Sequence, residues 1–212
     1  MGMIFHLRQV TPDELQSFQT DPNRVTDAVH GASAWTAAKV QAAFQRIQEA
    51  AQELRARAAG RSVEEQEQIR AQLLKDLEAS GAGFPYGLNS EDTLSLEKSW
   101  HVLHYLLTGK TQEAAPPLGD AILGGKEIGG DLGYGPARFL TPQQVREVAT
   151  ALASISTDTL KSRFDLKTMI AARIYACKDK GELDLAQDYF KHLSRYYTEA
   201  AANGNAMLLY IV

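Results

Sequence analysis

Only one of the 212 residues, Cys177, is a cysteine. A single thiol can form neither an internal disulfide nor a zinc site made of several thiolates, and we expect Cys177 to be a small buried residue. The chain also lacks any run that approaches the roughly 20 apolar residues of a membrane-spanning helix. Residues 1–6 lack the basic region and apolar stretch of a secretion signal. These absences predict a cytoplasmic protein with no membrane partner.

An excess of basic charge is absent as well. The chain has 22 Lys and Arg residues against 26 Asp and Glu residues, for a net charge of −4. A weakly acidic chain has no general attraction for nucleic acid or anionic lipid. Nucleic acid is therefore not an expected partner, and the composition leaves the oligomeric state open.

The motifs of common enzyme classes are also missing. The sequence contains no Gly-x-Ser-x-Gly nucleophile turn, no phosphate-binding loop and no His-Glu-x-x-His zinc motif. We therefore predict no catalytic residue, no metal and no cofactor. This favours a non-enzymatic protein, although it leaves the question of an enzyme open.

What the sequence does contain predicts an α+β fold. Residues 3–10 and 206–212 have the length and the apolar composition of strands. An apolar strand at the chain end must be buried, so we expect both ends to lie in one small sheet. Helices are predicted at 142–154, 165–177 and 182–203. The prediction is a single, mainly helical α+β domain over residues 1–212.

Two helix starts and one helical hairpin have clear local signals. Thr11 and Thr141 each precede a proline and stand three residues before Glu14 and Gln144, which predicts two capping boxes. Residues 33–80 are rich in charge, Ala and Gln and carry two apolar stripes of helical spacing. We predict a charged helical hairpin there, either packed on the fold as an insertion or serving as a partner-binding arm.

Candidate site residues cluster on a helix expected from about Ser95 to Thr108. At helical spacing Glu97, His101 and His104 share one sector beside Trp100. The carboxylate could orient an imidazole for acid–base chemistry or join both histidines around a metal. Histidines beside an apolar stripe are also common as ordinary hydrogen-bonded residues, so that alternative stays open.

A second candidate element is rich in glycine. Seven of the 16 glycines fall between positions 119 and 135. The simplest interpretation is a pair of tight turns around a short strand at 121–123. Tyr134 and Arg138 flank the second turn, and an aromatic ring with a guanidinium could bind a carboxylate, a phosphate or a base ring.

The order and spacing of these blocks resemble the bacterial YfbM-like family, a domain of unknown function. The resemblance covers nearly the whole chain and is carried by Met1-Gly2-Met3-Ile4, by Leu96-Glu97-Lys98-Ser99-Trp100-His101-Val102-Leu103-His104 and by Gly133-Tyr134-Gly135-Pro136-Ala137-Arg138. It is weakest at about 35–80. The resemblance implies a single α+β domain and supplies no catalytic or binding residues.

Two functional hypotheses follow. The first is a non-enzymatic protein-binding module that engages another protein, as an immunity protein does with its toxin. The second is a small-ligand-binding protein or enzyme in which the Glu97, Trp100, His101 and His104 face adjoins the turn of Tyr134 and Arg138. A third outcome is that both blocks are purely structural.

Overall fold

The computed structural model describes residues 2–33, 52, 65, 69 and 93–212. The elements below belong to one compact unit, formed by residues 1–31 and 89–212. The hairpin predicted at 33–80 lies outside the described residues except for isolated positions, so it remains a prediction.

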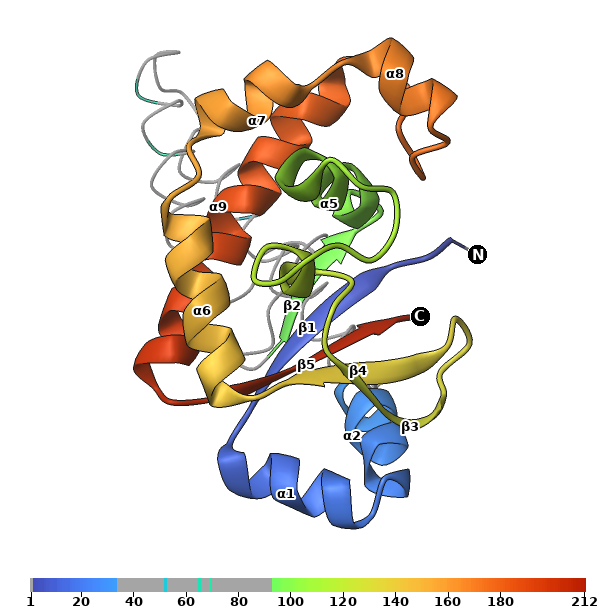
Figure 1. Ribbon diagram of the computed structural model, residues 1–212, viewed down its shortest axis with the longest axis vertical. Helices are drawn as coiled ribbons and strands as arrows, with labels where there is room; N and C mark the ends of the chain where they lie inside the picture. The colour runs from blue at the N-terminus through green and yellow to red at the C-terminus, as the bar shows by residue number, and fades with distance from the viewer. Residues whose placement is uncertain (1, 34–51, 53–64, 66–68, 70–92) are drawn as a thin grey trace. The chain divides into compact units, whose positions relative to one another are not determined.

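Five antiparallel strands form one sheet in the order β2-β1-β5-β4-β3 (Figure 1). The strands are β1 (Phe5–Val10), β2 (Thr93–Glu97), β3 (Lys126–Asp131), β4 (Pro136–Leu140) and β5 (Ala206–Ile211). The first and last strands are therefore neighbours inside the sheet. This confirms the expectation that both chain ends lie in the same sheet.

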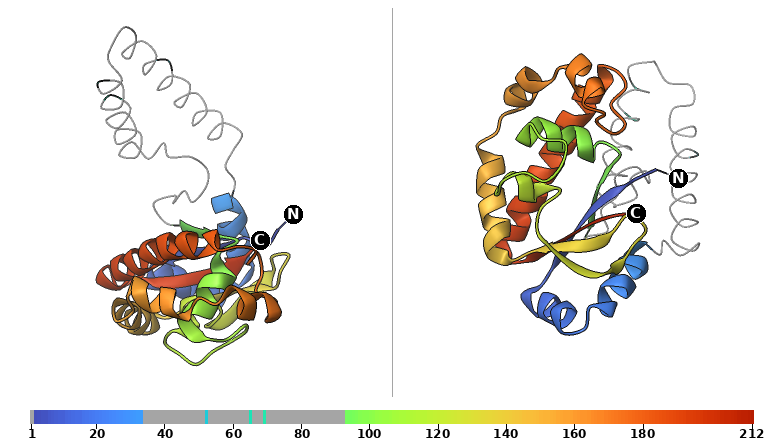
Figure 2. Two further views of the ribbon diagram at one scale, coloured as in Figure 1. Left: turned by 90° about the horizontal axis from the view of Figure 1, so that it is seen from above. Right: turned by 45° about the vertical axis from the view of Figure 1, so that its right-hand side comes forward.

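Helices cover both faces of this sheet (Figures 1 and 2). They are α1 (Pro12–Thr20), α2 (Asn23–Ser33), α5 (Trp100–Thr108), α6 (Pro142–Ala153), α7 (Thr157–Arg163), α8 (Leu166–Ala171) and α9 (Gly181–Ala202), with a short 3-10 helix, η1 (Gly119–Ala121). Strand alternation divides the core between the faces: Met207 and Leu209 pack with α5, α6 and α9, whereas Leu208 and Tyr210 pack with α1 and α2. The α+β class is confirmed.

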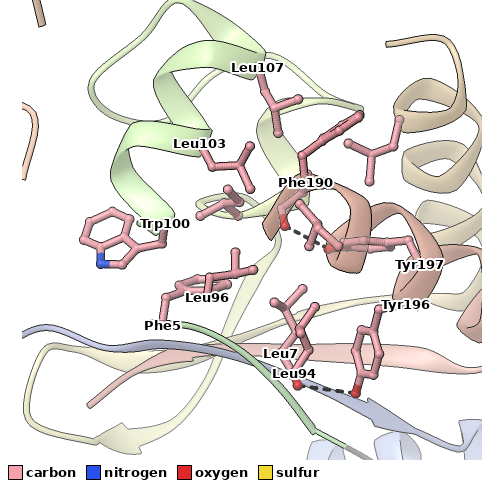
Figure 3. Packing of buried hydrophobic residues seen from close by; sticks show 14 of the residues in the cluster. Phe5, Leu7, Leu94, Leu96, Trp100, Leu103, Leu107, Phe190, Tyr196 and Tyr197 are labelled. Carbon is pink, nitrogen blue, oxygen red and sulfur yellow. Dashed lines mark hydrogen bonds between the residues drawn. The ribbon is translucent and has the colours of Figure 1, made fainter. Parts of the chain in front are cut away.

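The larger core is closed by tyrosines of α9. Tyr197 is completely buried, and its hydroxyl donates to the Ala121 carbonyl at 3.1 Å. The Tyr196 hydroxyl donates to the Leu7 carbonyl at 3.3 Å, so α9 is tied to β1 as well as packed on it (Figure 3). Because buried polar groups are costly without partners, these two bonds fix the position of α9 along the sheet.

Local signals predicted the starts of α1 and α6 correctly. Both capping boxes are present: each threonine hydroxyl accepts a backbone N–H from the third helical residue, and that residue's side chain accepts from the threonine N–H. Cys177 is buried, as expected. Predictions that depend on contacts distant in sequence were less accurate.

Three predicted elements are wrong in type or extent. The helix expected from Ser95 begins at Trp100, because residues 93–97 pair with β1 as a strand. The segment 121–123 is not a strand, since Ala121 ends η1. The helix expected at 165–177 ends at Ala171, and the backbone then takes positive φ angles at Arg173 and Ala176, which a continuing helix does not permit.

The central position of β5 in the sheet leads to a prediction about stability. Leu208→Ala in β5 removes a completely buried side chain, and we expect the free energy of unfolding to fall by about 2–5 kcal/mol. Ile170→Ala is the control, because Ile170 is 49% exposed and its truncation should cost well under half as much. Urea unfolding followed by circular dichroism measures both. Equal losses would contradict a buried central position for β5.

Candidate functional site

A cavity of about 430 Å³ opens where α5, the loop after it, η1 and the ends of β4 and β5 meet. It brings together four of the six predicted site residues: Trp100, His101, Tyr134 and Arg138. The other lining residues are Phe5, Thr111, Gln112, Glu113, Ile122, Leu123, Pro136, Leu209, Tyr210 and Ile211. The volume lies in the range of small-molecule sites.

Trp100 and His101 form a flat aromatic stack beside this cavity. Their ring centroids lie 4.8 Å apart with an interplanar angle of 12°. The Trp100 side chain stands at the edge of the core cluster (Figure 3), and its indole N–H donates to the Met3 carbonyl at 3.4 Å. Met3 also donates its backbone N–H to the Tyr175 hydroxyl at 3.0 Å. The amino-terminal segment thus holds the aromatic stack in place.

Both ring nitrogens of His101 are already engaged. Nδ1 accepts the Tyr175 backbone N–H at 2.8 Å, so Nε2 carries the proton and donates to the Thr111 carbonyl at 2.8 Å. Burial lowers the pKa of His101, while the bond to Thr111 acts in the opposite direction. A protonated ring would place a second hydrogen against the Tyr175 N–H. His101 is therefore a neutral, fixed residue with no free nitrogen for acid–base chemistry.

His104 is completely buried and does not line the cavity. Its Nε2 lies 2.6 Å from the Gln112 carbonyl and donates to it. Burial and the neighbouring His101 lower the pKa of His104, against the bond to Gln112, which raises it. The two histidines therefore donate hydrogen bonds to consecutive carbonyls, those of Thr111 and Gln112. These bonds position the loop that forms one wall of the cavity.

Glu97 does not join the histidines. It ends β2 in a left-handed conformation, with φ at 48°, and its carboxylate accepts from the Ser95 hydroxyl at 3.2 Å. The predicted Glu97–His101 pair required both residues on one helix, and that helix starts only at Trp100. The expected carboxylate–imidazole pair is absent for this reason.

Arg138 supplies a cation to the cavity wall. One guanidinium nitrogen donates to the Leu123 carbonyl, and the other lies 2.8 Å from a Glu113 carboxylate oxygen and 3.6 Å from one of Glu127. Gly125, next to Lys126 at the start of β3, lies close to the backbone of β4: its φ is 88°, and a Cβ there would lie 2.7 Å from the Phe139 carbonyl oxygen. Arg138 is thus held in position by a backbone carbonyl and balanced by two acidic side chains.

Tyr134 sits on the turn between β3 and β4 and is 48% exposed. The Asp131 carboxylate organises this turn by accepting the backbone N–H groups of Gly133 and Gly135 at 2.7 and 2.9 Å. These two bonds lower the pKa of Asp131. The glycine-rich segment is therefore a structured turn that presents an aromatic ring at the cavity.

Sequence reasoning missed the loop that carries Thr111, Gln112 and Glu113. This loop has no periodicity and no motif, and its place at the cavity follows from the histidine bonds of α5. The ion pair of Glu113 with Arg138 had no signal in the sequence.

Two further findings concern the described part of the chain alone. No group of three or more His, Cys, Asp or Glu side chains is placed there to hold a metal ion. No helix within it combines the length and apolar character needed to cross a membrane.

Comparisons with known proteins agree on the fold. A family model described as "Domain of unknown function (DUF1877)" matches residues 1–210. Among solved structures, the chain is similar to the protein of unknown function YfbM from Escherichia coli, with 17% identity and a TM-score of 0.58 over 99% of each chain. At this identity the likeness shows the fold alone. A search of curated proteins found no significant match.

The two histidines of α5 predict a pH dependence of stability. Their pKa values are lowered in the fold, so the unfolded chain binds more protons below about pH 6.5, and stability falls with pH from that point toward the lowered values. In the double variant His101→Asn, His104→Gln, the free energy of unfolding should change less between pH 7.5 and 5.5. Asn keeps an acceptor for the Tyr175 N–H, and Gln keeps a donor for the Gln112 carbonyl.

The readout is the difference between the two pH values in urea unfolding, not the absolute stability of the variant. His6, whose pKa burial lowers to about 4, contributes equally to both proteins and serves as an internal background. An unchanged pH dependence in the double variant would contradict the neutral state of these histidines, in which His101 is hydrogen-bonded at both ring nitrogens and His104 at Nε2 alone.

Proposed function

We propose that this chain, which belongs to the DUF1877 family, a domain of unknown function, is a non-enzymatic protein. Its cavity is suited to a small molecule with an apolar body and an anionic group. The observation that carries this proposal is the convergence of Trp100, His101, Tyr134 and Arg138 on one cavity.

An apolar or aromatic body fits the interior of the cavity. Its lining includes the core residues Phe5, Ile122 and Leu209. The exposed ring of Tyr134 adds a face on which a flat group can stack, and the buried Trp100, stacked on His101, lies behind the wall. Transfer of a ligand's apolar surface from water to these walls supplies affinity that does not depend on orientation.

An anionic group fits Arg138. Its carboxylate partners, Glu113 and Glu127, are 70% and 62% exposed, and exposed ion pairs contribute only about 0–1 kcal/mol. A ligand anion that approaches from the cavity can therefore replace Glu113 at small cost. The bond to the Leu123 carbonyl meanwhile holds the guanidinium in place.

Binding is favoured over catalysis by the state of the histidines. His101 has no free ring nitrogen, and His104 is sealed in the core. The protein-binding hypothesis stays a prediction, because the helical hairpin on which it depends lies outside the described residues.

The proposal is tested with three probes of the same shape: benzoate, benzamide and benzamidine, which are anionic, neutral and cationic. We expect benzoate to shift the Trp100 indole N–H resonance of the full chain in NMR titrations, and the other two to bind more weakly. Trp35→Phe leaves a single indole and assigns the signal.

Two variants of the ion pair give opposite expectations. Arg138→Gln removes the cation and should weaken benzoate binding about 10- to 100-fold, in line with the 1.5–3 kcal/mol of a charged hydrogen bond. Glu113→Gln removes the competing carboxylate and should strengthen it. Arg195→Gln, an exposed residue paired with Glu199, is the control. Equal binding of the three probes, or no effect of Arg138→Gln, would overturn the proposal.

A further inference from the structure

A second set of polar side chains lies on the face of the sheet that is opposite to Leu7 and Leu209. Strand register places Arg8 of β1 directly across from Thr93 of β2, and His6 directly across from Tyr210 of β5. Side chains opposite each other on one face lie about 5 Å apart at Cβ, and diagonal neighbours remain within reach of long side chains. Arg8, Thr93 and Tyr210 therefore meet above β1.

Among the described residues, no acidic side chain balances the charge of Arg8. One terminal nitrogen donates to the Ala28 carbonyl at 2.7 Å, and Nε is buried without a hydrogen-bond partner. Within the described part of the chain, no ion pair involves Arg8, whereas Arg138 has two. Half-buried arginines are normally paired, because an unbalanced charge away from water is costly.

Thr93 adds a second donor without a partner. The residue is 9% exposed, and its hydroxyl oxygen is buried with no hydrogen bond. The Tyr210 hydroxyl is close enough for Thr93 and Arg8 to act on the phenol: burial raises the pKa of Tyr210 to about 12, while Arg8 and Thr93 oppose this rise. The contact between the Thr93 and Tyr210 hydroxyls nevertheless lacks hydrogen-bonding geometry, so Thr93 Oγ1 has no hydrogen-bond partner.

His6 forms a neutral wall of this cluster. Its ring stacks on Tyr210 with centroids 5.3 Å apart and an interplanar angle of 17°. Burial lowers the pKa of His6 to about 4, so the ring is uncharged near neutral pH. Both His6 and Arg8 are half-buried, so part of the cluster lies at the surface of the protein.

We propose that Arg8, Thr93 and Tyr210 form a binding site for an oxyanion, the carboxylate or phosphate group of a ligand. The cluster offers a guanidinium N–H and two hydroxyls around a single positive charge, and an oxyanion is the partner that only accepts hydrogen bonds. A buried donor without a partner destabilises the fold, so an anion that accepts hydrogen bonds from these donors stabilises the folded state. The site shares Tyr210 with the lining of the cavity, but its charged group does not belong to the proposed function, because neither Arg8 nor Thr93 lines the cavity.

The experiment measures the melting temperature of the full chain at pH 7 in sodium chloride, sodium acetate and sodium phosphate at matched ionic strength. We expect acetate or phosphate to raise it in a saturable manner, and the stronger of the two identifies the anion class. Phosphate also stabilises proteins generally by exclusion from their surface, so variants must separate the two effects.

Thr93→Val is the decisive variant. It replaces a hydroxyl that has no partner with a methyl group of the same shape, so its melting temperature in chloride should equal or exceed that of the wild type. The saturable rise with the anion should shrink in Thr93→Val and disappear in Arg8→Gln.

Arg138→Gln separates this site from the cavity, since it should weaken benzoate binding there about 10- to 100-fold and leave the effect of the small anion unchanged. A uniform response of wild type, Thr93→Val and Arg8→Gln to every salt would overturn the oxyanion site. If Arg8→Gln fails to fold, an undiminished saturable response in Thr93→Val alone overturns it.

Discussion

The pairing of the first strand with the last is the interaction on which the rest of the structure depends. β1 and β5 run antiparallel over six residue pairs, from Phe5 opposite Ile211 to Val10 opposite Ala206. The outer edges of both strands are also hydrogen-bonded, to β2 and β4, so this ladder is the interior of the sheet. Both candidate sites are built on it: Phe5 and Leu209 line the cavity, and Arg8 and Tyr210 lie in the polar cluster.

The polar groups of α5 show how a promising motif can serve the fold. Two histidines three residues apart suggest chemistry, but their Nε2 atoms bind consecutive carbonyls of the following loop. The loop in turn carries Glu113 to Arg138 across the cavity. The histidines thus act on the candidate site indirectly, as positioning residues that fix where its acidic wall lies.

The sequence predicted what is decided locally or by strong apolar character. Both capping boxes depend on residues within one turn, and the terminal strands and α9 carry unmistakable apolar patterns. β3 was missed because Gly129 and Gly130 give it little intrinsic preference for a strand, so its conformation follows from pairing with β4. Residues 93–97 fit both a strand and the start of a helix, and the partner strand β1 decided between them.

Part of the candidate site could also be predicted from the sequence. Trp100 and His101 follow from the helix, and Tyr134 and Arg138 from the turn, and the structure brings them to one cavity. The role predicted for Glu97 was wrong, because it required Glu97 to lie on the helix, which begins only at Trp100. Glu113 could not be found, because a loop without periodicity gains its place only through contacts with a folded neighbour.

The two arginines of the sheet differ in what balances their charge, and this difference separates the roles that we assign to them. At Arg138 a ligand anion must displace the exposed carboxylate of Glu113, so the apolar part of the ligand adds to the affinity that the guanidinium provides. At Arg8 a backbone carbonyl is the only partner in the described structure, so an anion gains the full interaction with the guanidinium. The cavity is therefore suited to select by shape and charge together, and the polar cluster by charge alone.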